Sequence, residues 1–558
     1  MKLKSREKSS RKPKAAARKP DSAQSWGERA AFPIVGIGAS AGGLEAFTQL
    51  LAVLPPDTGM AFVLIQHLDP THTSFLAEAL AKATAMPVRQ AADGDRVAPN
   101  CVYVIPPNAE LGILHGQLTL LPRPDDARKF HLPVDFFFRA LAADHGSQAI
   151  GVILSGTASD GTEGLKAIKA EEGITFAQDP KSAKFGGMPH SAIDAGVVDY
   201  VLAVAEIAKE LVRLSRHPYV SLRATPPAKS DESTLNKIFL LVRDAVGVDF
   251  SEYKGATFER RLARRMALCH VETTQGYLVL LRQDPGEIRS LYEDALIHVS
   301  SFFRDRDVFE GLKTELLPQI LKAKPEGGAI RVWVAGCSTG EEVYSLAICL
   351  LELVGSTEAH PIQIFGSDVS DKAIEKARLG VFAESAVRDV SGERRRRFFS
   401  KADAGWRVSK IVRDLCVFVR HDLARDPPFS RLDLVSCRNT LIYFDQPLQK
   451  RILLTFHYAL NQPGFLLLGR TESISGFTQL FSPVDKSNKV FTRTAGRSLL
   501  QFAPRSETHP PARRVEVALP DQRRPVDVGK HLDRMLVARY APPGVLINDR
   551  MEILQFRG

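Results

Sequence analysis

The stretch that most constrains the fold is Ile330–Leu346, which reads IRVWVAGCSTGEEVYSL. It predicts a buried strand over Ile330–Ala335, then a turn of small residues, and then an apolar helix that runs to about Val354. A strand that passes through glycines into a helix N-terminus brings backbone and free amide donors close to a ligand. The stretch therefore predicts a ligand site at a strand end of an α/β sheet.

The charge of this turn indicates the kind of ligand. Glu341 and Glu342 are consecutive carboxylates at the helix start, where a phosphate binder would carry the opposite charge. A cationic ligand with hydroxyls, such as S-adenosylmethionine (SAM), suits them better. The next predicted strand, IQIFGSD, ends on Asp368, where an acidic residue can hold ribose hydroxyls. Strand–glycine–helix junctions are common in α/β proteins, so this pattern alone is weak evidence.

Further motifs in a fixed order carry a family resemblance. SSFFRD precedes the turn, and SDVS, CRNTLIYFD and GFLLLGRTE follow it. With CSTGEE they make the segment from about Leu235 to Thr494 resemble the chemotaxis methyltransferases (CheR). The resemblance implies a small helical subdomain and a Rossmann-like domain that uses SAM to methylate receptor glutamates.

The resemblance also implies which residues bind the cofactor. They are Ser300, Arg304, Glu341, Asp368, Asp422, Leu423, Arg438 and Asn439. Asp368 is expected at the ribose, and Asp422 and Leu423 near the adenine. Family sequences often read NLTAFFR, so His298 stands for the asparagine and Ser300 keeps the hydroxyl of the threonine. Because the acceptor carboxylate is itself the nucleophile, positioning and desolvation would supply most of the catalysis.

An earlier segment, about Phe32–Arg216, alternates predicted strands and helices. The alternation predicts a doubly wound, mostly parallel sheet with helices on both faces. Two runs, Cys101–Pro107 and Gln117–Leu121, predict a small antiparallel excursion from this sheet. The chain is thus α/β in both its large parts.

Three polar residues follow predicted strands of this earlier segment. Ser40 precedes Ala41 and two glycines, so its hydroxyl would lie on a tight turn beside amide donors, which suits a nucleophile. His67 ends the second strand and is a candidate general base, and Asp160 in LSGTASDG is a candidate partner that orients the imidazole. The carboxyl ends of parallel strands meet at one edge, so we expect these residues to converge.

Each of the three residues also has a plainer interpretation. Ser40 could be a helix N-cap, which its motif alone favours by about two to one. His67 could be a satisfied polar residue with His72 as a rival base, and Asp160 before Gly161 could serve a turn. Their joint occurrence favours the catalytic interpretation.

The surrounding motifs add a second resemblance. GIGASAGG, IQHLDP, LSGTASDGTEG and DPKSAKFGGMPHSAIDAG resemble the catalytic domain of the chemotaxis methylesterases (CheB). This resemblance implies Ser40, His67 and Asp160 as a catalytic triad, with the backbone amides of Ala41 and Thr157 at the oxyanion site. Ala41 replaces a commoner threonine and Thr157 stands where methionine is frequent, but a backbone donor survives either change. Most such esterases carry an N-terminal receiver domain, and with about 31 residues before this segment we expect no gating by phosphorylation in cis.

Two arginine runs have open interpretations. For Arg260, Arg261, Arg264 and Arg265, a solvated helix face and a contact to acidic receptor helices, which the resemblance suggests, stand at about even odds. A second run, Arg394–Arg397, lies in a lobe inserted into the methyltransferase segment. Runs of this kind are more often exposed helix than binding site.

Composition limits the remaining possibilities. The first twenty residues hold nine lysines or arginines and one acid, which accounts for most of the net charge of +10, so the body is not predicted to bind nucleic acid. The six cysteines show no CxxC pair or metal-like spacing, which suits a reducing cytoplasm and predicts no metal. No apolar run approaches the roughly 20 residues that cross a bilayer, so we expect no membrane insertion.

The expected order is a disordered basic tail (1–31), a methylesterase domain (32–216), a linker (217–232), a helical subdomain (233–293), a methyltransferase domain (294–494), a second linker (495–530) and the start of a PAS-like segment (531–558). The last segment ends in VLINDRMEILQF, which is one hairpin of a PAS sensor domain. The chain is then expected to be either a fragment of a longer hybrid sensor protein or a natural truncation.

The combined prediction is a bifunctional signalling enzyme of the cytoplasm. It would methylate receptor glutamates with SAM and hydrolyse the methyl esters, with glutamine deamidation as a further candidate reaction. The expected partners are cytoplasmic domains of methyl-accepting receptors, and a histidine kinase or response regulator is a further candidate. One alternative is a catalytically quiet sensor or scaffold module of a two-component hybrid protein that binds SAM or partners. Another keeps both activities but directs them to a different substrate.

Overall fold

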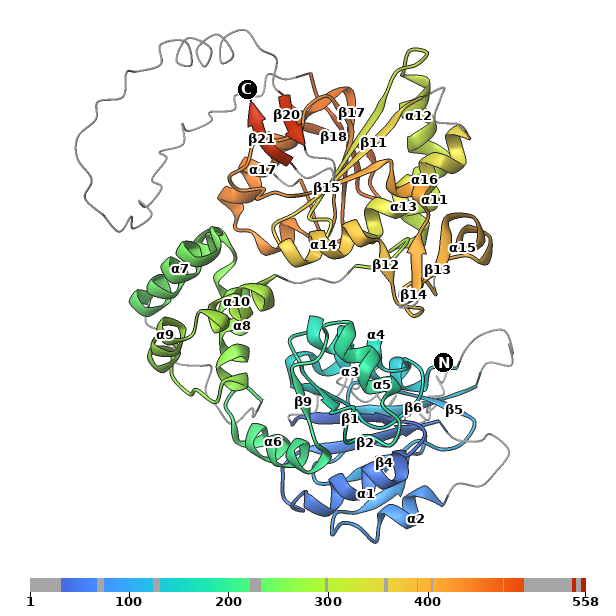
Figure 1. The fold of residues 1–558 in the computed structure, drawn as a ribbon, viewed down its shortest axis with the longest axis vertical. Helices are drawn as coiled ribbons and strands as arrows, with labels where there is room; N and C mark the ends of the chain where they lie inside the picture. Colours follow the sequence, from blue (N-terminus) through green and yellow to red (C-terminus); the bar gives the residue numbers. More distant parts are fainter. Residues whose placement is uncertain are drawn as a thin grey trace, which may run out of the picture.

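The computed structural model describes residues 32–67, 75–123, 131–220, 232–296, 300–355, 360–388, 390–402, 405–474, 476–495, 544–547 and 553–557. The predictions for the tail at 1–31, for His72, for His298 and for most of the second linker lie outside these residues. Three bodies follow one another along the chain: a first α/β domain, a helical subdomain and a second α/β domain (Figure 1).

The first domain is built on a seven-stranded sheet in which every strand pair is parallel. Its order is β3-β4-β2-β1-β7-β8-β9. The strands are β1 (Ile34–Ala39), β2 (Ala61–Gln66), β3 (Val88–Gln90), β4 (Val102–Val104), β7 (Ala149–Ile153), β8 (Ile174–Gln178) and β9 (Tyr200–Leu202).

Helices cover both faces of this sheet, and each face has its own apolar core. One face packs against α1 (Gly43–Val53), α2 (Leu76–Leu80) and α6 (Val204–Arg216), and the other against α3 (Pro133–His145), α4 (Thr162–Ala170) and α5 (Gly187–Asp194). A short turn of 3-10 helix, η1 (Gly146–Gln148), follows α3. The doubly wound fold predicted from the alternation is confirmed.

The predicted antiparallel excursion is only half right. A hairpin of β5 (Ala109–Leu114) and β6 (Gln117–Pro122) exists, but β4 joins the parallel sheet beside β2. The three β4 residues are at most 2% exposed. An apolar run without alternation is typical of a parallel strand covered on both faces, and the sequence VYV has that character.

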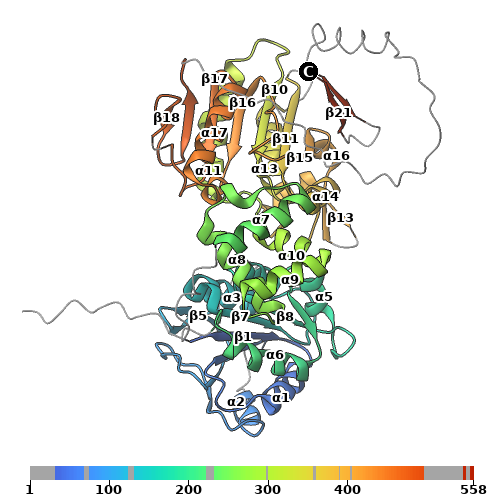
Figure 2. The same cartoon turned by 90° about the vertical axis from the view of Figure 1, so that its left-hand side faces the viewer.

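The helical subdomain comprises α7 (Glu232–Val246), η2 (Phe250–Glu252), α8 (Gly255–Leu268), α9 (Thr274–Gln283) and α10 (Pro285–Ala295). It has a core of its own, around Ile238, Leu262 and Tyr277. Figures 1 and 2 show it beside and between the two sheets. Ahead of it, residues 217–220 pack onto the first domain: Val220 is 1% exposed, and the Tyr219 hydroxyl donates to the carbonyl of Glu172 at 2.6 Å. The rest of the predicted linker lies outside the described residues.

The second domain has a seven-stranded sheet of order β15-β11-β10-β16-β17-β19-β18. The strands are β10 (Ile330–Ala335), β11 (Ile362–Asp368), β15 (Cys416–Arg420), β16 (Leu432–Cys437), β17 (Leu460–Leu468), β18 (Phe481–Asp485) and β19 (Val490–Arg493). The first five in spatial order are parallel, and β19 and β18 are antiparallel additions. This arrangement confirms the predicted Rossmann-like fold.

The helices of the second domain are α11 (Arg306–Gly311), the π-helical turn η3 (Leu312–Leu316), α12 (Leu317–Lys322), α13 (Glu341–Val354), α14 (Asp371–Leu379), α16 (Lys410–Arg413), η4 (Leu441–Tyr443) and α17 (Gln446–Ala459). Helix α13 ends where the sequence predicts. Helix α17 begins at Gln446, because Asp445 caps it by accepting from the amide of Leu448 at 2.9 Å.

A lobe inserted in the second domain contains α15 (Gly392–Phe398) and the strands β12 (Val381–Phe382), β13 (Phe399–Ala402) and β14 (Gly405–Val408). Near the end of the chain, β20 (Gly544–Ile547) and β21 (Ile553–Arg557) pair as an antiparallel hairpin. The PAS-like interpretation of this hairpin stays a prediction. Among the helices that the structure describes, none has both the length and the apolar character needed to cross a bilayer.

Candidate active sites

The first site lies at the carboxyl edge of the first sheet. Ser40 directly follows β1, His67 follows β2, and Asp160 lies between β7 and α4. Because β2, β1 and β7 are neighbours in the sheet, their ends meet. The turn after Ser40 contains Gly42 at φ 77°, where a Cβ atom would also lie 2.7 Å from the Ser155 hydroxyl. Only glycine fits this turn without strain.

His67 and Asp160 form a close pair. The Nε2 atom of His67 lies 2.7 Å from Oδ2 of Asp160, whose residue is 1% exposed. The backbone amides of Val134 and Asp135, in the first turn of α3, also donate to this carboxylate, at 3.0 and 2.9 Å. Three donors therefore stabilise a buried charge that can orient the imidazole.

Ser40 and His67 line one shallow cavity of about 560 Å³, together with Gln66 and Lys184. They are not hydrogen-bonded to each other in this structure, and contacts of this kind often tighten only when substrate binds. With Nε2 held by Asp160, the nitrogen left for Ser40 is Nδ1. The catalytic role of the three residues stays a prediction, supported by the His67–Asp160 pair and by the cavity that Ser40 and His67 share.

The two predicted oxyanion amides lie beside Ser40. Ala41 is its direct neighbour, and the Ser155 hydroxyl donates to the Ala41 carbonyl at 2.8 Å. Thr157 follows Gly156, where a Cβ atom would lie only 3.1 Å from the Cβ of Ser40. Neither the Ala41 nor the Thr157 amide donates to another described residue, so both remain available to a ligand.

A second buried carboxyl group, which sequence analysis missed, lies next to Asp160. Burial and the charge of Asp160 raise the pKa of Asp135 to about 7. Its Oδ1 accepts from the Gly164 amide at 2.7 Å, whereas Oδ2 is buried without a hydrogen-bond partner. In sequence Asp135 is an ordinary acid in the first turn of a helix, so no local signal singles it out.

The second site is a cavity of about 650 Å³ at the carboxyl ends of β10, β11 and β16. Seven of the eight predicted cofactor residues line it: Ser300, Arg304, Asp368, Asp422, Leu423, Arg438 and Asn439. They come from three strand ends and from the SSFFRD loop. Sequence motifs that lie up to 139 residues apart thus face one space, although their role in binding stays a prediction.

The eighth residue, Glu341, does not line this cavity. Its carboxylate accepts from the Thr339 hydroxyl at 2.7 Å and borders a neighbouring cavity. Glu342 lines the first cavity instead, and it accepts from the Ser436 hydroxyl at 2.6 Å and from Arg438 at 3.1 Å. Successive helical residues point about 100° apart, so the two glutamates border different cavities, and the role of Glu341 in binding the cofactor stays a prediction.

The glycine turn after β10 fits a cofactor of the SAM type. Gly336 has φ 73°, and a Cβ atom there would lie 2.3 Å from the Thr440 hydroxyl. The Ser338 amide donates to Asp368 at 2.8 Å, and the buried Ser338 hydroxyl has no hydrogen-bond partner. An orphaned hydroxyl beside several carboxylates suits a ligand that has both hydroxyls and a positive charge.

Asp422 and Arg438 both line this cavity but differ in the contacts that hold them. Burial raises the pKa of Asp422, whose carboxylate accepts from the Ala424 amide at 2.9 Å. The Arg438 side chain is 1% exposed and donates to Asp305 at 2.6 Å and to the carbonyl of Arg304 at 3.0 Å. Arg438 therefore holds the SSFFRD loop against α13 rather than projecting freely toward a ligand.

The first domain also contributes to the wall of this second cavity. Gly146 and Ser147 of η1 and residues 170–172, at the end of α4, line it, and Arg260 of α8 lines it as well. Lys166 of α4 donates to the carbonyl of Ser300 at 3.1 Å. The cavity is thus assembled by all three bodies, which the sequence motifs alone do not indicate.

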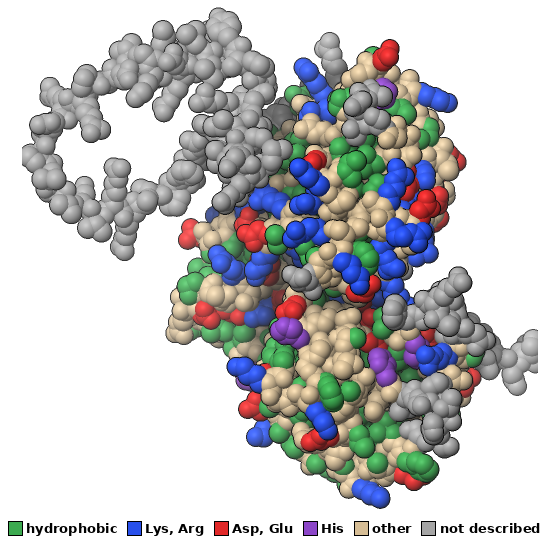
Figure 3. All heavy atoms as spheres, turned by 45° about the vertical axis from the view of Figure 1, so that its right-hand side comes forward, with side chains coloured by type: hydrophobic (Ala, Val, Ile, Leu, Met, Phe, Trp, Pro, Cys, Tyr) green, Lys and Arg blue, Asp and Glu red, His purple; other side chains and the backbone are tan. Residues whose placement is uncertain are grey.

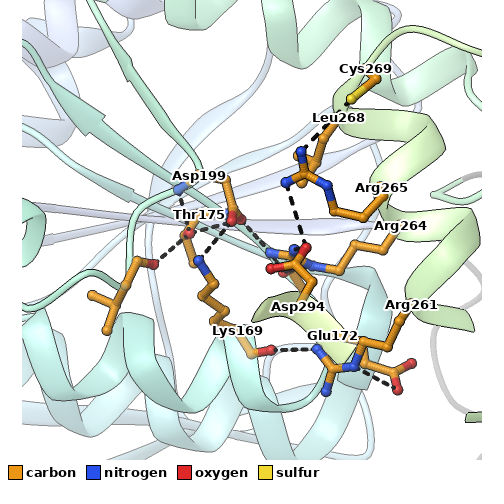
Figure 4. A network of polar contacts seen from close by, with 12 residues as sticks. Lys169, Glu172, Thr175, Asp199, Arg261, Arg264, Arg265, Leu268, Cys269 and Asp294 are labelled. Carbon is orange, nitrogen blue, oxygen red and sulfur yellow. Dashed lines mark hydrogen bonds and ion pairs between the residues drawn. The ribbon is translucent and has the colours of Figure 1, made fainter. Parts of the chain in front are cut away.

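An interdomain network of charged side chains joins the first domain to the helical subdomain (Figure 4). Its members are Lys169, Glu172, Asp199, Arg260, Arg261, Arg264, Arg265 and Asp294. At its centre Arg264, with a fully buried side chain, pairs with Asp199 of the first domain and, at 2.6 Å, with Asp294 of α10. The same guanidinium donates to the carbonyl of Gly173 at 3.1 Å.

The network corrects the predictions for the first arginine run. Arg261 is 3% exposed and Arg264 is fully buried, so neither belongs to a solvated face or is available to a receptor. Their spacing of three residues puts both on the side of α8 that faces the first domain. Figure 3 shows other lysines and arginines gathered on the upper part of the molecule, over the second domain.

Comparison with known families agrees with this division of the chain. The CheB methylesterase model matches residues 35–211, the all-alpha domain of CheR methyltransferases matches 233–296, and their SAM-binding domain matches 298–490. The SAM-binding match and the fit of the cavity identify SAM as the methyl donor of this part.

Individual relatives cover different parts of the chain. An uncharacterised 104.1 kDa protein of Rhodobacter capsulatus is 36% identical over 87% of this chain, which spans 53% of that protein's length. A chemotaxis protein methyltransferase of Vibrio cholerae is 31% identical over 42% of this chain and 83% of its own length. A protein-glutamate methylesterase/protein-glutamine glutaminase of Moorella thermoacetica is 36% identical over 34% of this chain and 45% of its own length.

The two sites and the matched families lie in the same two parts of the molecule. The serine site falls within the methylesterase match, and the acidic cavity within the SAM-binding match. The first domain is therefore the esterase domain, and the helical subdomain and second domain together form the transferase. The chain belongs to the chemotaxis methylesterase and chemotaxis methyltransferase families and joins the two in one polypeptide.

Proposed function

We propose that this chain methylates glutamate side chains in the cytoplasmic domains of receptors and hydrolyses the methyl esters that it forms. The observation that supports the proposal is the presence of two candidate sites in one chain. One is Ser40 beside the His67–Asp160 pair, and the other is the acidic cavity at β10 and β11. A quiet sensor module, the rival interpretation, would not need both.

In the esterase domain, the Ser40 hydroxyl attacks the ester carbonyl while His67 takes its proton through Nδ1. Asp160 stabilises the resulting imidazolium through the 2.7 Å contact at Nε2. The amides of Ala41 and Thr157 donate to the oxyanion. His67 then returns the proton to the leaving methanol, and water hydrolyses the acyl-enzyme. A glutamine side chain follows the same path with ammonia as the leaving group.

In the transferase, bound SAM supplies an electrophilic methyl group. The chain's own residues bind and orient: Asp368 and Ser338 are placed to hold ribose hydroxyls, and Glu342 faces the positive end. Arg304 and the half-buried Tyr443 border the space that an acceptor carboxylate would enter. A carboxylate needs no general base, so alignment and exclusion of water carry the reaction.

The proposal includes the expected surroundings of the enzyme. We place it in the cytoplasm, with receptor cytoplasmic domains as substrate and a histidine kinase or response regulator as a further partner. We retain the boundaries of the methylesterase (32–216), helical (233–293) and methyltransferase (294–494) units as part of the same proposal.

The test is a transfer assay with a methyl label. The chain is incubated with methyl-labelled SAM and a receptor cytoplasmic domain, and label is followed into base-labile protein ester and into methanol. Both products are expected, and a receptor with its acceptor glutamates changed to alanine is the control. Binding of SAM without label in either product would instead favour the sensor module.

A further inference from the structure

The wall of the transferase cavity contains a glutamate from the opposing enzyme. Glu171 ends helix α4 of the esterase domain and lines the cavity together with Asp368, Asp422 and Tyr443. Its side chain is exposed, and no hydrogen bond or ion pair joins its carboxylate to another described residue. An exposed carboxylate with no partner among the described residues thus belongs to the wall of the space in which the proposed reaction needs one.

A second observation, from electrostatics, concerns the position of the Glu171 carboxylate. Burial raises the pKa of Tyr443, and the charges of Glu472 and Glu171 act in the same direction. The charges of Arg261 and Arg304 act on the pKa of the same phenol in the opposite direction. Tyr443 therefore has both the Glu171 carboxylate and the Arg304 guanidinium within electrostatic range, at the mouth where an acceptor would enter.

The residues around Glu171 are held rigidly against α8. Arg261 donates to the carbonyl of Ala170 at 3.1 Å, Arg260 donates to the carboxylate of Glu172 at 2.7 Å, and Arg264 donates to the carbonyl of Gly173. Glu172 also adopts a left-handed backbone with φ 69°. This left-handed residue belongs to the C-cap of α4: the Gly173 amide donates to the Ile168 carbonyl at 2.9 Å and fixes the turn that follows Glu171.

We propose that Glu171 is a methyl acceptor of the transferase in the same chain, a self-modification site. This inference rests on the proposed function, because it uses the same cavity and the same donor. One carboxylate oxygen of Glu171 attacks the methyl carbon; the O–CH₃ bond forms while the S–CH₃ bond breaks. The electron pair of the broken bond goes to sulfur, S-adenosylhomocysteine leaves, and no proton is transferred.

The neighbouring Glu172 offers an internal contrast. It is buried and engaged by Arg260 and Arg261, so its oxygens are not free to attack. Methylation of Glu171 removes one negative charge from the cavity mouth and leaves the interdomain network intact. The product is a glutamyl methyl ester, the class of bond that the esterase domain hydrolyses.

The first test measures binding rather than turnover. SAM carries a positive sulfonium and S-adenosylhomocysteine does not, so a nearby carboxylate favours only the former. In calorimetry, Glu171→Gln is expected to weaken SAM binding by about threefold to tenfold. The affinity for S-adenosylhomocysteine should not change. Glu206→Gln, at an exposed glutamate on α6, is the matched control and should change neither. Unchanged SAM affinity in Glu171→Gln would overturn the placement.

The second test looks for the ester itself. A Ser40→Ala chain, which cannot hydrolyse it, is incubated with SAM and digested for mass spectrometry. One base-labile methyl group is expected on the peptide that contains Glu171, in a fraction independent of chain concentration, and Glu171→Gln in the same background should lack it. Its absence, or labelling that rises with chain concentration, contradicts transfer within one chain.

A receptor domain added to the same reaction separates the two proposals. Methylated receptor with unmodified Glu171 would overturn this inference and leave the proposed function standing. Bound SAM with neither the receptor nor Glu171 methylated would overturn the proposed function and this inference with it.

Discussion

The three predicted esterase residues all follow strands of one sheet, whereas the transferase cavity takes its walls from three separate parts of the chain. Ser40, His67 and Asp160 need only the order β2-β1-β7 to meet. The cavity around Asp368 needs, in addition, α8 and the end of α4. A change in the first domain can therefore reach the second enzyme, but the esterase site has no comparable dependence on the transferase.

Among the substitutions that compare the esterase site with the transferase cavity, Ser40→Ala is expected to have the largest effect. Loss of a triad nucleophile should lower ester hydrolysis by about a thousandfold or more, because no other group can form the acyl-enzyme. Affinity for SAM, measured by calorimetry, should not change, since the nucleophile lies in a different cavity. If the Ser40→Ala variant released methanol at the rate of the unmodified chain, Ser40 would be a helix cap and not the nucleophile.

Arg264→Ala breaks the interdomain network at its centre. It leaves Asp199 and Asp294 buried without their guanidinium, which typically costs about 3–5 kcal/mol in free energy of unfolding. Chemical denaturation measures the loss, and SAM affinity should fall while the specific activity of folded esterase is kept. The matched control is Arg396→Ala, at an exposed arginine of the second run, with an expected change within about 0.5 kcal/mol.

Asp135→Asn tests the buried carboxyl pair of the esterase domain. The folded pKa of about 7 lies above the ordinary value of 3.8, so the folded state holds this proton more tightly than the unfolded state. Its stabilising contribution is complete below about pH 4 and is lost as pH rises through 7. Between pH 5 and 8 the free energy of unfolding of the unmodified chain should fall by about 2–3 kcal/mol relative to that of Asp135→Asn. Denaturation curves of the two proteins, recorded at each pH, measure this difference. Parallel stability profiles for the two proteins would contradict this.

Asp368→Asn should have the smallest effect of the four, and it should be confined to the transferase. The substitution removes the charge that accepts from the amides of Ser338 and Ser370 and that faces the cavity. We expect SAM binding to weaken by about 1–3 kcal/mol in calorimetry, the range for hydrogen bonds to a charged group. Ester hydrolysis should be unchanged, and a fall in it would mean that the two sites are coupled in both directions.

The sequence was most informative where a strand ends. Apolar runs predict the strands, and the residue that follows each run is then placed at the sheet edge, as for Ser40, His67 and Asp368. The sequence was less informative where the function depends on the direction in which a side chain leaves a helix. Glu341 and Glu342 differ by one position, and only the packing of α13 decides which of them faces the cavity.

Contacts between separately folded parts were the hardest to predict. The two arginine runs look alike in sequence, but Arg261 and Arg264 are buried against the esterase domain, whereas Arg394 pairs with Glu352 of its own domain at 2.8 Å. No local pattern reveals which carboxylate will lie opposite, because Asp199 is 65 residues away in the chain from Arg264. Asp135 was missed for the same reason: Asp135 lies in helix α3, whereas its neighbour Asp160 follows β7, 25 residues further along the chain.

The burial of Arg264 has a consequence for how the joined enzymes respond to salt. Dissolved ions screen charges only through the water between them, over about 8 Å at physiological ionic strength. The pair of Arg451 with Glu252 joins the helical subdomain to the second domain. Both side chains are half-exposed, so this pair is open to such screening. The side chains of Arg264 and Asp199 are 0% and 2% exposed, so counter-ions cannot gather around this pair. Raising ionic strength should therefore loosen the outer contacts first, and the esterase should remain attached to the transferase well beyond the salt concentration at which the surface pairs are lost.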